Sequence, residues 1–163
     1  MIRVQQEDFD IGAELARLTA GRSDVGGLAS FVGLVRDLAE GQALTAMTLE
    51  HYPGMTEKRL AEIEAEARRR WVLLDSLIIH RHGRLRPGER IVLVATAASH
   101  RAAALESCEF LIDWLKTQAP FWKLEETAAG SHWVAARDAD DAAAARWRSF
   151  LPPRPPKGGR GSG

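Results

Sequence analysis

The stretch SHRAAALESCEFLIDWLKTQAPFWK, from Ser99 to Lys123, carries the longest helical pattern in the chain together with its end signal. Apolar residues recur there at helical spacing and predict a helix over about 100–118. Pro120 forces the preceding residue out of the helical region, so the chain must leave the helix before it. The expected apolar stripe of this helix consists of Ala102, Leu105, Leu111, Ile112 and Leu115.

Four basic residues mark the two ends of this stretch. His100 and Arg101 stand at the expected helix start, where the helix dipole is already positive, and no acid follows either of them by three or four residues. Lys116 and Lys123 flank the break at Pro120. Cations without a local counter-ion at a helix start predict an anion that comes from outside the chain.

The segments outside this stretch predict several strands and three further helices. Asp10 is expected to cap a helix that Gly21 closes, and Thr56 to cap a helix with Leu60, Ile63, Ala67 and Trp71 on one face. An alanine-rich helix is expected over 138–147. The expected strands cover 2–4, 25–35, 43–52, 75–82 and 90–98, followed by a hairpin of FWKLEET and SHWVAA around Gly130. This succession predicts an α+β domain and also permits a partly parallel sheet.

Length and composition fit one soluble globular domain. The chain has 163 residues, 45% hydrophobic and 27% charged. We expect a single catalytic domain over 1–150 and a disordered, Pro/Gly-rich tail over 151–163. The 22 Lys and Arg residues balance 22 Asp and Glu, and three of the basic residues lie in the tail. The remaining, slightly acidic body argues against a nucleic-acid binder.

The N-terminus and the cysteine content indicate where the protein works. MIRVQQEDFD lacks the apolar core of a signal peptide, and no apolar run approaches membrane-spanning length. Cys108 is the only cysteine, so no internal disulfide can form. We therefore expect a cytoplasmic protein that does not contact a membrane.

Six cationic residues stand at chain breaks: Arg36, His100, Arg101, Lys116, Lys123 and Arg137. Each alone has an ordinary explanation, since Lys116 could pair with Asp113, Arg36 with Asp37, and Arg137 with nearby acids. Together they predict a site for a phosphorylated substrate, because binding groups gather at the ends of elements. A lysine held near other cations can act as a base, an acid or a nucleophile.

Other candidate groups carry weaker signals. His80 and His82 would lie on one side of a strand, but no third metal ligand is evident, so we expect neither a metal nor a cofactor. Cys108 lies among apolar residues in the middle of a helix, which is typical of an inert buried thiol. The basic run Arg68–Arg70 suits the negative end of a helix on a solvated face.

Five motifs give the chain a family resemblance. MTLEHYPGMTEK (47–58), SHR (99–101) and LKTQAPFWK (115–123), together with FVGLVRD (31–37) and HWVAARD (132–138), resemble the large, catalytic subunit of molybdopterin synthase. The similarity runs from about Val25 to Trp147. It implies an α/β hammerhead-type fold with an additional antiparallel sheet, and a sulfurtransferase of molybdenum cofactor biosynthesis.

The resemblance also implies a reaction and its partners. The family transfers sulfur from the thiocarboxylated C-terminus of a small ubiquitin-like subunit to cyclic pyranopterin monophosphate, forming the molybdopterin dithiolene. It assembles as a heterotetramer around a homodimer of large subunits. The alternative from the residues alone is a non-catalytic phosphate-ligand-binding or regulatory module.

Carried onto this sequence, the family's catalytic lysines are Lys116 and Lys123. Its substrate-binding groups are Arg36, His100, Arg101, Glu125 and Arg137, with Arg137 expected to act across the dimer.

Overall fold

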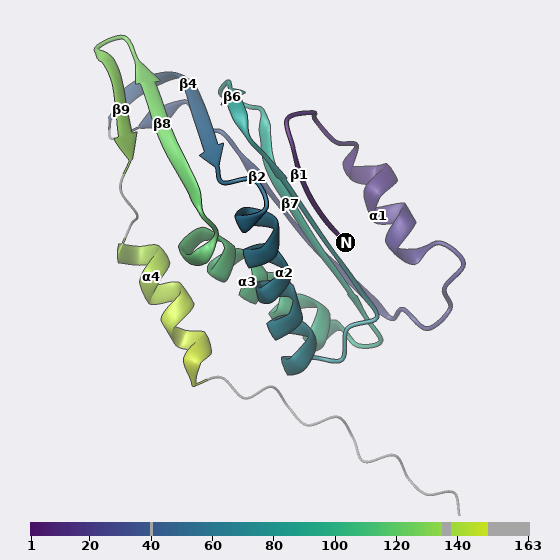
Figure 1. Cartoon of the computed structure of the whole chain (residues 1–163). Helices are drawn as coiled ribbons and strands as arrows, with labels where there is room; N and C mark the ends of the chain where they lie inside the picture. Colours follow the sequence, from purple (N-terminus) through teal and green to yellow (C-terminus); the bar gives the residue numbers. More distant parts are fainter. Residues whose placement is uncertain (40, 135–137, 150–163) are drawn as a thin grey trace, which may run out of the picture.

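Two β-sheets and their covering helices make up the computed structural model, which describes residues 1–39, 41–134 and 138–149 (Figure 1). The predicted α+β domain is confirmed. The elements in chain order are β1 (Ile2–Gln5), α1 (Ile11–Thr19), β2 (Gly27–Leu34), β3 (Leu38–Ala39), β4 (Gln42–His51), α2 (Met55–Arg70), β5 (Asp75–Arg81), β6 (Gly83–Leu85), β7 (Arg90–Ala98), α3 (Arg101–Gln118), β8 (Phe121–Thr127), β9 (Gly130–Val134), α4 (Asp138–Ala145) and a 3₁₀ turn at Arg146–Arg148.

The first sheet has the strand order β1-β5-β7-β2. β1 runs parallel to β5, and the other neighbours are antiparallel, so the sheet is partly parallel as the sequence permitted. The central strands β5 and β7 are buried on both faces, because α1 covers one face of the sheet and α2 with α3 cover the other (Figure 1). Ile78 and Val94 pack with α2 and α3, whereas Leu77 and Leu93 pack toward α1, as the alternation of side chains along a strand requires.

The second sheet has the order β3-β4-β8-β9, and β6 pairs with β4. Every pairing in it is antiparallel. Its inner residues form a separate core of Val35, Leu44, Met47, Leu49 and Leu85, against which Ile91 of β7 packs. Ile91 belongs to the first sheet, so this small core lies where the two sheets meet.

Of the two N-cap residues that the sequence predicts, one caps its helix and the other does not. Asp10 caps α1, since its Oδ1 accepts a hydrogen bond from the Ala13 amide at 2.9 Å. The prediction of Thr56 as a cap is wrong: Gly54 is the cap residue of α2, and the Glu57 carboxylate accepts from its amide at 2.7 Å. Gly54 has φ 83°, a conformation that glycine adopts without strain, so the helix begins two residues earlier. Thr56 is fully buried, and its hydroxyl hydrogen-bonds the backbone of Tyr52.

The predicted core faces of the two long helices hold in part. Leu60, Ile63, Ala67 and Trp71 of the α2 segment are all buried. In α3 the buried face starts at Ala104 and continues through Cys108, Leu111 and Leu115. Ala102 and Leu105 were expected on this face but are exposed, because Leu105 lies about 100° and Ala102 about 160° of rotation from Ala104.

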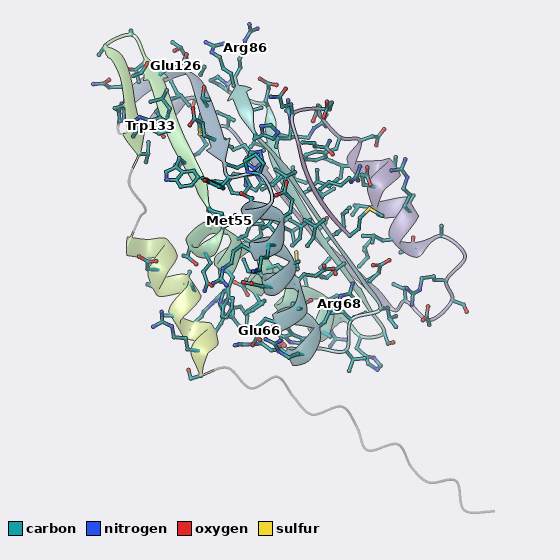
Figure 2. The ribbon with its side chains drawn as sticks, viewed as in Figure 1. Met55, Glu66, Arg68, Arg86, Glu126 and Trp133 are labelled. Atoms are coloured by element: carbon teal, nitrogen blue, oxygen red, sulfur yellow. The ribbon has the colours of Figure 1, made fainter. Side chains whose placement is uncertain are left out.

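The basic run at the end of α2 is paired locally. Arg68 contacts Glu64 at 3.1 Å, while Arg69 and Arg70 both contact Glu66. Figure 2 shows Glu66 and Arg68 at the end of the molecule away from the β8–β9 hairpin, where Glu126 and Trp133 lie. The run therefore stabilises its own helix, as the sequence predicted. None of the helices in the described part of the chain combines the length and the apolar content that a membrane crossing needs.

Candidate active site

A pocket of about 700 Å³ opens where the two sheets and the end of α3 come together. One wall comes from β2 and the start of β7, another from β4 and β8, and the last turns of α3 close it. About half of its lining is apolar, with Phe31, Met47 and Ile112 among the contributors. The polar lining consists of Arg36, His80, Lys116, Lys123 and Glu125.

Pro120 explains how the two lysines reach this pocket. α3 ends at Gln118, Ala119 has the extended values φ −76° and ψ 132°, and β8 begins at Phe121. Lys116 projects from the last turn of the helix and Lys123 from the returning strand. Two amines that lie on different elements are thereby placed in one recess.

β8 presents alternate residues to the pocket. Phe121, Lys123 and Glu125 line it, whereas Trp122 on the opposite face is 49% exposed. The predicted placement of Lys123 and Glu125 on one strand face is confirmed. Glu125 is only 6% exposed, and its Oε2 lies 3.6 Å from Nε2 of His132 on β9. The buried carboxyl group of Glu125 therefore lies two residues from Lys123 on the same face of β8.

His80 is a pocket residue that the sequence did not assign to the site. It lies in β5, is 6% exposed, and stacks on Phe121 with ring centroids 3.7 Å apart. Burial lowers the pKa of His80 to about 4, and the nearby His51 and His82 act in the same direction against the hydrogen bond to Arg81. The ring is therefore neutral at physiological pH. A signal was present, since His80 directly follows the apolar run Leu77–Ile79 of its strand, and a histidine buried there requires a polar partner or an opening.

Two of the predicted site residues, His100 and Arg101, do not line this pocket in the single chain. His100 and Arg101 are exposed at the opposite end of α3 from Lys116. Arg101 and Lys116 are fifteen positions apart in the helix, about 22 Å along the axis. Arg137 lies outside the described residues. The pocket of one chain thus brings together Arg36, Lys116, Lys123 and Glu125, but neither His100 nor Arg101.

A second hollow lies beside the start of α1 and is lined by Asp8–Gly12 and Arg90. The Arg90 guanidinium is paired with the Asp8 carboxylate, because Arg90 Nε donates to Asp8 Oδ1 at 2.8 Å and Arg90 Nη2 contacts Oδ2. The hydrogen bond from Arg90 lowers the pKa of Asp8 to about 2. This hollow is shallow and offers an anion no uncommitted cation of its own.

Metal and thiol chemistry receive no support from the described residues. Within 1–39, 41–134 and 138–149, no group of three or more His, Cys, Asp or Glu could hold a metal ion. Cys108 is buried, and burial raises the pKa of its thiol to about 11. The thiol is therefore protonated and inert, as the sequence predicted.

Comparison with known proteins gives one family. The model of the MoaE protein family matches residues 4–118. A molybdopterin synthase catalytic subunit from Ralstonia nicotianae is 58% identical over 146 residues, which is 90% of this chain and 83% of the relative. The solved molybdopterin biosynthesis MoaE protein from Burkholderia ambifaria is 57% identical, with a TM-score of 0.79 over 92% of this chain and 99% of that one.

A more distant structure shares the fold. The complex of subunits 1 and 2 of molybdopterin-converting factor from Helicobacter pylori includes a chain with a TM-score of 0.69 and 20% identity, covering 83% of this chain and 91% of that one. On the family model and the close relatives together, the chain belongs to the MoaE protein family.

Proposed function

We infer that this chain is the catalytic subunit of a molybdopterin synthase, a sulfurtransferase of molybdenum cofactor biosynthesis, and that the pocket between the two sheets is its active site. The observation that carries the site assignment is the presence of Lys116 and Lys123 in one recess with Arg36. The substrate is cyclic pyranopterin monophosphate. The sulfur donor is the thiocarboxylated C-terminus of a small ubiquitin-like subunit.

The pocket offers chemically distinct surfaces to these two reactants. Arg36, exposed just beyond the end of β2, holds the phosphate, which a guanidinium binds through two hydrogen bonds. The apolar wall that includes Met47 and Ile112 receives the flexible tail of the small subunit. Binding both in one recess places the thiocarboxylate sulfur beside the pterin carbons, and such positioning supplies a large part of the rate.

The lysines serve the bond changes. At each carbon, sulfur replaces an oxygen substituent, which leaves as water or, where the cyclic phosphate opens, as the phosphate oxygen. The acyl–sulfur bond then breaks when water or a lysine amine takes the acyl group, leaving sulfur on the pterin. Lys116 or Lys123 transfers the protons that these steps and the opening of the cyclic phosphate require. Glu125, buried on the same strand face as Lys123, supplies the negative charge that keeps an ammonium group in the pocket.

A second copy of the chain completes the site with His100 and Arg101. β2 is an edge strand whose start lies against α3, since a Cβ at Gly27 would be 3.2 Å from the Arg101 Cα. The other end of β2 leads into the pocket at Arg36. A two-fold axis that pairs the β2 edges antiparallel therefore brings the His100 and Arg101 of one copy to the pocket of the other.

The exposed apolar residues of β2 support this arrangement. Leu28 and Phe31 are each 39% exposed and Leu34 is 54% exposed, although all three lie on an open strand edge. A homodimer of large subunits would cover them, with one small subunit at each pocket giving a heterotetramer. Arg137 stays a proposed substrate-binding residue across the dimer. We place the complex in the cytoplasm, because a thiocarboxylate donor requires a reducing compartment.

Reconstitution tests the proposed function directly. The purified chain, the thiocarboxylated small subunit and cyclic pyranopterin monophosphate should together yield molybdopterin, measured as its dithiolene or an oxidised fluorescent derivative. Lys116→Arg and Lys123→Arg separate this function from a phosphate-binding module, because arginine keeps the charge but cannot give up its proton. An enzyme loses turnover in both variants. Full turnover in both would contradict the assigned chemistry.

A further inference from the structure

His80 and Phe121 join the two sheets at the floor of the pocket. His80 belongs to β5 of the first sheet and Phe121 to the start of β8 in the second, and both line the recess. Their rings stack with centroids 3.7 Å apart and an interplanar angle of 16°. Arg36 follows a strand of the first sheet, and Lys123 lies in the second. The stack therefore spans the same gap that a substrate held by both residues must span.

The His80 ring is fixed on its own side of the gap. Nδ1 lies 2.8 Å from the carbonyl oxygen of Arg81. Because a carbonyl oxygen only accepts hydrogen bonds, Nδ1 carries the proton, and the neutral ring has one defined tautomer. The residue is 6% exposed and sits in a strand that is paired on both sides, with β1 and with β7. It offers Phe121 an uncharged and rigid surface.

The start of β8 meets the first sheet through this stack. Within the described residues, the ladder between β8 and β9 begins at Lys123, and Phe121 and Trp122 pair with β4. Phe121 is the last pair of the ladder with β4, opposite His51, and follows directly after Pro120, which has no amide hydrogen to donate. Lys123 comes two residues later on the same strand face. The position of its amine thus depends on how Phe121 is seated.

We propose that His80 is a positioning residue for sulfur transfer, whose ring, through Phe121, sets the distance of Lys123 from the first sheet. This inference rests on the proposed function, because it assigns Lys123 a part in the reaction. A change of about 1 Å in the place of a reacting group lowers turnover by as much as about 100-fold. A stack between sheets is well placed to prevent such a change.

Two substitutions at position 80 and one control test the inference in the reconstituted heterotetramer. His80→Ala removes the ring, and we expect kcat to fall about ten-fold or more while KM stays within about two-fold. His80→Phe restores a stacking ring without the imidazole nitrogens and should recover kcat to within about three-fold of wild type. His82→Ala removes a neighbouring histidine that does not line the pocket and should leave kcat unchanged.

The outcomes separate this inference from the proposed function. An unchanged kcat in His80→Ala, or an equal loss in His80→Phe, overturns the positioning role while wild-type activity upholds the function. An inactive wild-type complex contradicts the function itself. Should His80→Ala fail to fold by circular dichroism, Phe121→Leu removes the other ring of the stack. It should show the same fall in kcat at unchanged KM, and normal turnover there would overturn the inference.

Discussion

Lys116 and Lys123 line one pocket although a proline separates the helix that carries the first from the strand that carries the second. The six residues between them include the end of α3, the extended Ala119 and the start of β8. Because the chain turns back at this point, both amines reach the same recess. Arg36, just beyond the end of β2, lines it as well. The three cationic side chains of the pocket therefore come from separate elements.

Removing either amine should abolish most of the turnover. Lys116→Ala and Lys123→Ala should each lower kcat by about 100-fold or more, the usual contribution of a positioned proton-transfer group. Dithiolene formation with thiocarboxylated partner is the measurement. The matched control is Lys58→Ala, which removes an exposed lysine of α2 that does not line the pocket. This variant should keep wild-type activity. Near-normal turnover in either pocket variant would remove that lysine from the mechanism.

Mixed oligomers should reveal a site built from two copies. Arg101→Ala and Lys123→Ala chains are each expected to be weakly active alone. When the two are dissociated and reassembled together, roughly one quarter of wild-type activity should return, because half of the dimers are mixed and each mixed dimer has one intact site. Arg101 in each copy then serves the pocket of the other.

The control for this experiment is a mixture of Lys116→Ala and Lys123→Ala chains. Both lysines line the pocket of their own chain, so every pocket in a mixed dimer lacks one of them and no activity should return. Activity in the control, or none in the Arg101 mixture, would contradict a composite site. A binding measurement tests the role of Arg101 separately. Arg101→Ala should bind the phosphorylated pterin more weakly than wild type, and an unchanged dissociation constant would refute the anion-binding role of Arg101.

The sequence predicted the local structure of α3 and β8 well because the signals are local. Helical spacing, the proline and strand alternation all act within a few residues, and they correctly placed Lys123 and Glu125 on one face. The predicted cap of α2 was wrong because threonine is a common cap residue, and residue type alone pointed to Thr56. The left-handed conformation available to Gly54 decided the helix start instead.

Contacts between distant segments could not be predicted in this way. The sequence analysis considered His80 only as a metal ligand together with His82, and rejected that role because no third ligand is evident. Its place in the pocket follows from how the two sheets meet, which no short pattern encodes. His100 and Arg101 were correctly placed at the start of α3, yet the length of that helix puts them far from the pocket of their own chain. A pattern that marks anion-binding residues does not say which copy of the chain they serve.

Cys108 should resist alkylation in the folded protein. The thiol is 6% exposed, its Sγ lies 3.8 Å from the Val94 carbonyl oxygen, and burial raises its pKa to about 11. At pH 8 the thiolate is therefore scarce, and we expect iodoacetamide to react about 100-fold more slowly than with the chain unfolded in guanidinium chloride. Mass spectrometry at timed intervals measures both rates. Equal rates in the two states would show that the thiol is accessible.

His80 should make the protein less stable in mild acid. Its pKa is about 4 in the folded chain against the ordinary value of 6.5, so between these pH values the unfolded chain binds a proton that the folded chain does not. The free energy of unfolding therefore falls as the pH drops through this window, by about 2 kcal/mol on reaching pH 5. The carboxyl group of Asp8, with a pKa of about 2, stays ionised throughout and adds no slope.

Denaturant unfolding at pH 7.5 and pH 5.0 measures this contribution. Wild type should lose stability between the two pH values, and His80→Phe should lose about 2 kcal/mol less, because phenylalanine keeps the stacking ring but cannot be protonated. His100→Gln, which removes an exposed histidine at the start of α3, should retain the wild-type loss. If the free energy of unfolding falls by the same amount in His80→Phe and in wild type, burial does not keep His80 neutral. The acid sensitivity of the protein then comes from other groups.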